Sequence, residues 1–119
     1  MLFQNLDRTY LNNIENKIQH ITNDKVTVTY SSNRYIEFNS IGVNKGIAVI
    51  ELGEMLGIKK EEIIAIGDNF NDLSMLNAAG LSIAVNNAVP PIKEIVDYVC
   101  ECNNNEGAVA EAIEKFIFN

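Results

Sequence analysis

The sequence is short of basic residues and of long apolar runs, and each shortage excludes a class of protein. Nine Lys and Arg stand against 16 Asp and Glu, which gives a formal net charge of -7. A nucleic acid or an anionic membrane surface would meet net repulsion from such a chain. No apolar run approaches the roughly 20 residues that span a bilayer, and residues 1–5 lack the basic and apolar pattern of a signal peptide. We therefore predict neither a nucleic-acid partner nor a membrane partner.

Cysteine and histidine are also scarce, with two cysteines and one histidine. The only two cysteines, Cys100 and Cys102, are separated by one residue, and in an extended segment their side chains would point to opposite faces. Such a pair suits neither a disulfide nor a zinc site. We therefore expect reduced thiols and a cytoplasmic location. The single histidine, His20, lies in a predicted surface helix and receives no role.

The first forty residues predict a helix followed by an antiparallel hairpin. Apolar residues recur at helical spacing over 11–21. Apolar and polar residues then alternate over 26–30 and again over 36–38, which is the period of a half-buried strand. The Ser-Ser-Asn sequence at 31–33 is a turn signal between the two strands.

After Gly42 the pattern changes to helices that alternate with apolar strands, which predicts a parallel sheet covered by helices. We expect an α/β fold: a partial doubly wound sheet in 41–119, preceded by an α-β-β piece in 1–40. The second part has these predicted elements: helix 48–56 capped by Gly57, strand 63–66, helix 73–77, strand 81–85, a helix from Pro90 towards Val99, and helix 109–117. Residues 98–100 are equally compatible with a short strand, which leaves the end of the Pro90 helix open.

Two carboxylates follow the first apolar strand of this second part. The sequence Gly-Asp-Asn-Phe-Asn-Asp at 67–72 places Asp68 just past the strand end, where ligands bind in open α/β sheets. Mg²⁺ prefers oxygen ligands and accepts one or two carboxylates together with waters and phosphate. Asn71 and Asp72 fall at a helix start, which favours anions. Taken alone, Asp72 is also compatible with a simple helix cap, and Asp68 with an ordinary turn.

Lys45 opens the helix that precedes the same strand. In a crossover connection this position can lie above the sheet edge that carries Asp68, where an ammonium would neutralise phosphoryl oxygens. A solvated surface lysine is the alternative. Phosphoryl transfer depends on positioning and charge stabilisation, so Mg²⁺ with one ammonium is a suitable set of groups.

In their order and spacing, three segments resemble the Cof-type phosphatases of the haloacid-dehalogenase-like superfamily. They are Gly-Val-Asn-Lys-Gly at 42–46, Gly-Asp-Asn-Phe-Asn-Asp-Leu-Ser-Met-Leu at 67–76, and Ala-Gly-Leu-Ser-Ile-Ala-Val-Asn-Asn-Ala-Val-Pro at 79–90. The resemblance extends over about residues 35–118 and includes 106–109, where Gly-Val before the last helix is usual in the family. The helix and hairpin of 1–40 look like the end of the family's inserted cap domain.

The resemblance implies a role for each matching residue. Lys45 matches the lysine that contacts the transferring phosphoryl group, and Asp68 matches a ligand of Mg²⁺. Asn71 matches an Asn that helps to bind phosphate or the surroundings of the metal, and Asp72 matches a carboxylate that orients the lysine or metal-bound water. Asn86 and Asn87 follow the next strand near the same rim, where a supporting role and a plain turn are equally compatible.

The chain also departs from the family pattern. Family members carry an Asp-x-Asp motif whose first Asp attacks phosphorus, forming an aspartyl-phosphate, and whose second Asp is the general acid and base. Here Asp occurs only at 7, 24, 68, 72 and 97, and no two are spaced by one residue. The Thr/Ser phosphate motif has no match either. We therefore expect a carboxy-terminal fragment, inactive alone, of a phosphatase acting on small phosphorylated metabolites such as sugar phosphates.

Without the nucleophile strand, which in the family pairs with the strand matching 63–66, that strand would keep an unpaired edge. Such an edge favours self-association, so a homo-oligomer is a second expectation.

A non-catalytic module that binds Mg²⁺ or phosphate, or that only self-associates, is the alternative function. A receiver-like phosphoacceptor domain fits poorly, because its acidic pair would come before its lysine, whereas Lys45 precedes Asp68.

Overall fold

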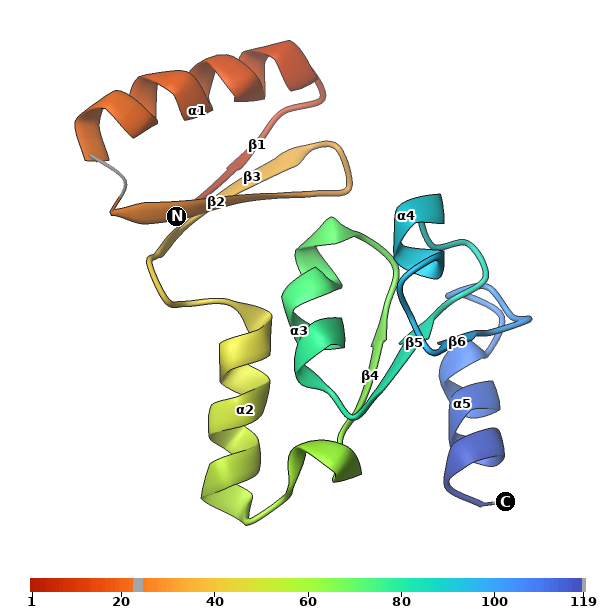
Figure 1. Cartoon of the computed structure of the whole chain (residues 1–119). Helices are drawn as coiled ribbons and strands as arrows, with labels where there is room; N and C mark the ends of the chain where they lie inside the picture. Colours follow the sequence, from red (N-terminus) through yellow and green to blue (C-terminus); the bar gives the residue numbers. More distant parts are fainter. Residues whose placement is uncertain (23–24, 119) are drawn as a thin grey trace. The chain divides into compact units, whose positions relative to one another are not determined.

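The computed structural model describes residues 1–22 and 25–118. The chain folds into two compact units, Met1–Asn44 and Lys45–Asn119 (Figure 1). Asp24, one of the five aspartates counted above, lies outside the described residues. No helix within the described ranges is long and apolar enough to cross a membrane.

The first unit is a three-stranded antiparallel sheet with one helix. Its elements are β1 (Leu2–Gln4), α1 (Arg8–Thr22), β2 (Val26–Ser31) and β3 (Tyr35–Ser40), and the strand order is β1-β3-β2. The carboxylate of Asp7 accepts hydrogen bonds from the backbone N–H groups of Thr9 and Tyr10, which caps α1. The helix and the hairpin predicted from the sequence are confirmed, whereas β1 was not predicted.

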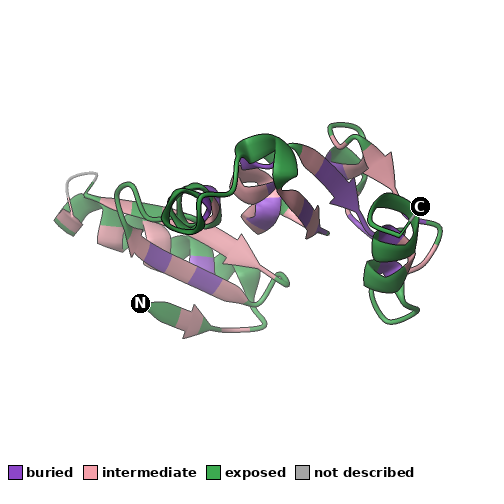
Figure 2. Ribbon diagram, turned by 90° about the horizontal axis from the view of Figure 1, so that it is seen from below, coloured by how far each residue is buried: buried purple, intermediate pink, exposed green. Residues whose placement is uncertain are grey.

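The alternating pattern of the hairpin places its apolar side chains in one small core. Ile36 and Phe38 of β3 are buried together with Leu11 of α1, whereas Glu37 between them is only half-buried. Figure 2 shows the burial class along the ribbon of the chain. Phe3 packs edge-on against Phe38 with 6.0 Å between ring centroids, so β1 contributes to the same core. The core follows directly from the period of two along the strands.

The second unit is built on a three-stranded parallel sheet in the order β4-β5-β6, which confirms the predicted α/β fold. Its elements in chain order are α2 (Lys45–Leu56), the 3₁₀ helix η1 (Lys60–Glu62), β4 (Ile64–Gly67), the 3₁₀ helix η2 (Phe70–Asp72), α3 (Leu73–Ala78), β5 (Leu81–Ala84), α4 (Pro90–Lys93), β6 (Tyr98–Val99) and α5 (Ala108–Phe116). The core of this unit gathers around Ile83 of the central strand, with Leu76 of α3 and Ala112 of α5 buried with it.

The helix that begins at Pro90 is shorter than the apolar spacing suggests. It ends at Lys93, and the alternative of a strand at the following residues is confirmed by β6. Asp97 explains the change, because its carboxylate accepts hydrogen bonds from the backbone N–H and the hydroxyl of Ser82, at 2.8 and 2.7 Å. These bonds fix the chain against β5 just before Tyr98, so it continues as a strand.

Helix α2 ends at Leu56, and the φ of +69° at the following Gly57 fits the predicted cap. Its buried residues are Gly46 and Gly53. The face formed by Ala48, Leu52, Met55 and Leu56 is exposed instead, and Met55 reaches 83 % exposure. Apolar residues lie on all sides of this helix, a composition that is typical of a helix surrounded by protein.

Glu111 of α5 ties the loop after β6 to the last helix. Its carboxylate accepts hydrogen bonds from the Glu101 and Cys102 backbone N–H groups, both at 2.9 Å, and from the Tyr98 hydroxyl at 2.8 Å. The bonds from the backbone at Glu101 and Cys102 lower the pKa of Glu111 from 4.5 to about 2. The ionised form is therefore stabilised by the fold.

A carboxyl whose pKa is lower in the folded chain stabilises it above the unfolded pKa, and this contribution is lost as the pH falls. For Glu111 the loss extends from about pH 4.5 down to about pH 2. We predict that Glu111→Gln lowers the unfolding temperature at pH 7 and that its difference from wild type shrinks across this window. Thermal unfolding followed by circular dichroism measures this, with Glu114→Gln on the same helix as the control. A difference that is constant with pH would contradict the assignment.

Candidate functional site

The turn after β4 brings the backbone of Gly67 very close to the side chain of Asp72. A Cβ atom added at Gly67 would lie 2.7 Å from the Cβ of Asp72, nearer than such atoms approach. Glycine is therefore required here for space, and it allows Asp72 to fold back over the strand end. Asn69 starts the following 3₁₀ helix, because its side chain accepts a hydrogen bond from the N–H of Phe70 at 2.8 Å.

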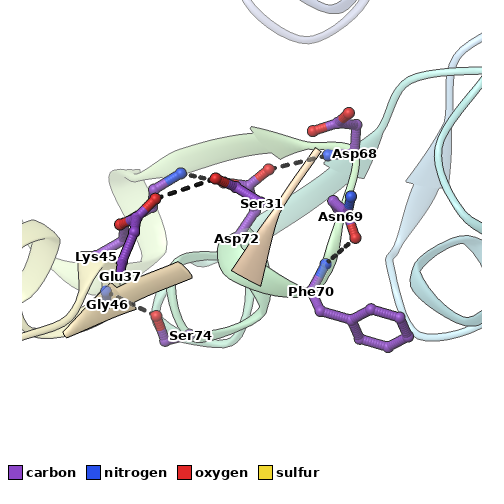
Figure 3. A network of polar contacts seen from close by, with 9 residues as sticks. All are labelled: Ser31, Glu37, Lys45, Gly46, Asp68, Asn69, Phe70, Asp72 and Ser74. Carbon is purple, nitrogen blue, oxygen red and sulfur yellow. Dashed lines mark hydrogen bonds and ion pairs between the residues drawn. The ribbon is translucent and has the colours of Figure 1, made fainter. Parts of the chain in front are cut away.

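Asp72 lies between Lys45 and Asp68 (Figure 3). Its Oδ1 atom is 2.5 Å from the Lys45 Nζ atom, and its Oδ2 atom accepts a hydrogen bond from the Asp68 backbone N–H at 3.1 Å. Asp72 is 6 % exposed, whereas the Lys45 side chain is half-exposed. Asp72 makes no side-chain cap to α3, so the interpretation as a simple helix cap is wrong. Lys45 and Asp68 thus meet at one carboxylate.

The start of α2 is also held at this place. The backbone N–H of Gly46 donates to the hydroxyl of Ser74 on α3 at 3.2 Å. Ser74 was not singled out from the sequence, and its role follows only from the packing of α2 on α3. The bond keeps Lys45 within reach of Asp72.

The two carboxyl groups have opposite shifts. Burial alone would raise the pKa of Asp72, but the hydrogen bonds from Lys45 and from the Asp68 backbone lower it overall. Partial burial, together with the hydrogen bond and the charge of Asp72, raises the pKa of Asp68. Asp72 is therefore the carboxylate that balances the ammonium, and Asp68 is the one that a cation would stabilise.

The structure places the remaining predicted residues in the turn after β4 and in the loop after β5. Asn71 is half-buried within η2, in the same turn. Asn86 and Asn87 are exposed in the loop after β5, where Asn87 forms hydrogen bonds with Asn104. Asn104 could not be predicted from local sequence, since the contact joins residues 17 positions apart.

Only part of a magnesium site can be built from this chain. The described ranges, 1–22 and 25–118, contain no group of three or more His, Cys, Asp or Glu that could hold a metal ion. Asp68 has an exposed carboxylate and Asp72 is neutralised by Lys45. Because Mg²⁺ is often held by one or two carboxylates, waters and a substrate phosphate, Asp68 fits one position in such a site.

The Gly67 contact generates a prediction for stability. Gly67→Ala would force the Ala Cβ against Asp72, and crowding of this kind costs about 1–3 kcal/mol. Gly53→Ala in α2 is the matched control. Its added Cβ would meet the movable Ile63 side chain at 3.2 Å and the Ile58 carbonyl oxygen at 3.3 Å, and the helix propensity gained, about 1 kcal/mol, offsets these milder contacts. Urea unfolding should show a clear loss for Gly67→Ala and little change for Gly53→Ala. Equal stabilities would contradict the close approach.

Comparisons with known proteins find a matching family model and related phosphatases. The family model described as haloacid dehalogenase-like hydrolase matches residues 1–113. The chain is 39 % identical over 95 residues to the 5-amino-6-(5-phospho-D-ribitylamino)uracil phosphatase YcsE of Bacillus subtilis, covering 80 % of this chain and 38 % of the relative. It is 47 % identical over 79 residues to the phosphoglycolate phosphatase of Methanosarcina mazei, covering 66 % of this chain and 34 % of the relative.

The solved structures give the same result for the fold. A haloacid dehalogenase-like hydrolase from Bacteroides thetaiotaomicron matches with a TM-score of 0.83 and 36 % identity, covering 98 % of this chain and 43 % of that one. A haloacid dehalogenase-like hydrolase from B. subtilis matches with a TM-score of 0.82 and 34 % identity, covering 98 % and 39 %. The chain spans about two fifths of the length of these proteins.

Proposed function

We propose that this chain, which belongs to the haloacid dehalogenase-like hydrolase family, forms the carboxy-terminal part of a magnesium-dependent phosphatase. The observation that carries the proposal is the Lys45–Asp72 ion pair at the end of β4, with the exposed Asp68 beside it. It combines one ammonium and one available carboxylate at a strand end, where ligands bind in parallel sheets.

Each residue has a role that its surroundings support. Lys45 is anchored by Asp72 yet half-exposed, so its ammonium can neutralise a phosphoryl oxygen of the substrate. Asp72 keeps that ammonium in place, and Asn71 in the same turn is suited to donate a hydrogen bond to phosphate. Asp68 would be a ligand of Mg²⁺, which when bound neutralises negative charge on the transferring phosphoryl group.

The attacking group is not among the described aspartates. Asp7 caps α1, Asp97 accepts hydrogen bonds from Ser82, and Asp72 is paired with Lys45. Asp68 alone is exposed at the site, and it fits the metal. No two aspartates of the sequence, Asp24 included, are spaced by one residue as in the Asp-x-Asp motif. We therefore propose that the aspartyl-phosphate forms on an aspartate outside this sequence, and that the chain is inactive when isolated.

The substrate class is proposed from the relatives. The two curated names specify phosphatases of small phosphorylated compounds, phosphoglycolate and a phosphoribitylamino uracil. We extend that class to this chain as small phosphorylated metabolites, sugar phosphates included.

Both cysteines are free, which supports a reducing, cytoplasmic location.

The proposal is tested by completing the chain. The chain is joined to the part of the B. subtilis phosphatase YcsE that the match does not cover. This chimera should release phosphate from para-nitrophenyl phosphate when Mg²⁺ is present. Lys45→Ala in this chimera should lower kcat by roughly 10²-fold or more, the usual loss for a group that stabilises transition-state charge. Lys59→Ala, an exposed lysine beyond α2, is the control. Magnesium-dependent turnover by the 119-residue chain alone, or an unchanged rate for Lys45→Ala, would refute it.

The exposed apolar surface of α2 favours a second function, self-association. Leu52, Met55 and Leu56 are exposed, and β4 pairs only with β5 among the described strands. An open strand edge and an exposed apolar helix surface can each be buried against the same surface of a second copy, in a two-fold symmetric contact. We propose this surface, defined by these three side chains and the free edge of β4, as a homodimer contact of the isolated chain.

We predict that the isolated chain is dimeric and that Met55→Lys makes it monomeric, because a buried unpaired charge opposes the contact. Light scattering coupled to size-exclusion chromatography measures the mass. Ile95→Lys, which adds the same charge at an exposed isoleucine outside this surface, should remain dimeric. A monomeric wild-type chain at high concentration would exclude the contact.

A further inference from the structure

Asp68 is fixed by a loop that contributes none of the proposed catalytic, substrate-binding or metal residues. Its backbone carbonyl accepts a hydrogen bond from the N–H of Val89 at 2.9 Å, and the carbonyl of Gly67 accepts one from Val85 at 3.2 Å. On its other side, the N–H of Asp68 is held by Asp72. The direction of the Asp68 side chain therefore depends on the loop 85–89 as well as on Asp72.

The loop 85–89 is tied in turn to the loop that follows β6. The Oδ1 atom of Asn87 accepts a hydrogen bond from the Asn104 backbone N–H at 2.9 Å, and its Nδ2 atom donates to the Oδ1 atom of Asn104 at 3.1 Å. The N–H of Asn86 also donates to the carbonyl of Cys102 at 2.9 Å. Three hydrogen bonds thus join two loops that lie far apart in the sequence.

The far end of this connection is rigidly anchored. Glu111 of α5 binds the backbone N–H groups of Glu101 and Cys102, just before Asn104. Hydrogen bonds linked by short stretches of backbone therefore connect α5, through Asn104 and Asn87, to Val89 and Asp68. Asn87 and Asn104 are both exposed, so their mutual bonds compete with water and add little stability. Their main effect is on geometry.

We propose that Asn87 and Asn104 are a positioning pair that fixes the backbone at Asp68 and so directs the carboxylate assigned to Mg²⁺. The pair acts through Val89 and touches neither substrate nor metal. This inference rests on the proposed function, since it concerns the direction of a metal ligand.

The test uses the full 119-residue chain and nuclear magnetic resonance of its backbone amides. Asn104→Ala, which removes the hydrogen bond donated by the Asn87 Nδ2 atom, should increase the hydrogen exchange rate of the Val89 amide about threefold, because the loop 85–89 is then held less firmly. It should also weaken, about three- to tenfold, the Mg²⁺ dissociation constant read from the Asp68 amide shift. Asn104→Asp keeps the Oδ1 acceptor and should restore both values. Asn105→Ala, an exposed neighbour in the same loop, should match wild type.

The outcomes separate this inference from the proposed function. Unchanged Val89 exchange and Asp68 shifts in Asn104→Ala would overturn the positioning pair. Faster exchange at Val89 with an unchanged Mg²⁺ dissociation constant would also overturn it, because the pair would then be purely structural. If wild type shows no Mg²⁺ response at Asp68, the metal role of Asp68 fails, and the positioning inference fails with it even where Val89 exchange changes. Activity of the completed chimera with Asn104 unchanged, and its loss in Lys45→Ala, test the phosphatase proposal independently.

Discussion

The carboxylate of Asp72 is the constraint on which the site depends. A buried carboxylate is tolerated only when it is paired and hydrogen-bonded, and here the pairing groups are the Lys45 ammonium and the Asp68 backbone N–H. These two contacts attach the start of α2 to the end of β4. They also explain Gly67, because only a residue without Cβ leaves room for Asp72 to turn back over the strand. The fold and the site thus share one interaction.

Much of this arrangement could be predicted where the signal is local. The alternation around Glu37, the apolar strand before Gly67 and the Gly57 cap each predict their own element, and the structure confirms them. The position of Asp68 past a strand end follows from the same local pattern. Features that depend on distant contacts were missed or left open. Sequence spacing does not show that Asp97 binds Ser82 and thereby ends α4 early.

The chain presents part of a site and part of a core, and both gaps lie on the same unit. Lys45 and Asp68 offer an ammonium and a carboxylate, while the attacking aspartate is proposed to come from elsewhere. Helix α2, apolar on all sides, exposes Met55 and its neighbours, and β4 has one free edge among the described strands. The exposed apolar residues are at the end of α2 where Gly53 approaches Ile63, just before β4, whereas Lys45 is at the other end of α2. The gap in the core therefore lies nearer the start of β4, and the gap in the site lies past its end.

The most direct measurement is a crystal structure of the chain soaked with Mn²⁺, a substitute for Mg²⁺ whose anomalous scattering locates it, and with inorganic phosphate. We expect the ion about 2.1 Å from a carboxylate oxygen of Asp68, with phosphate between the ion and the Lys45 ammonium. An ion bound elsewhere, or phosphate that does not contact Lys45, would contradict the assignment of this strand end as a phosphatase site.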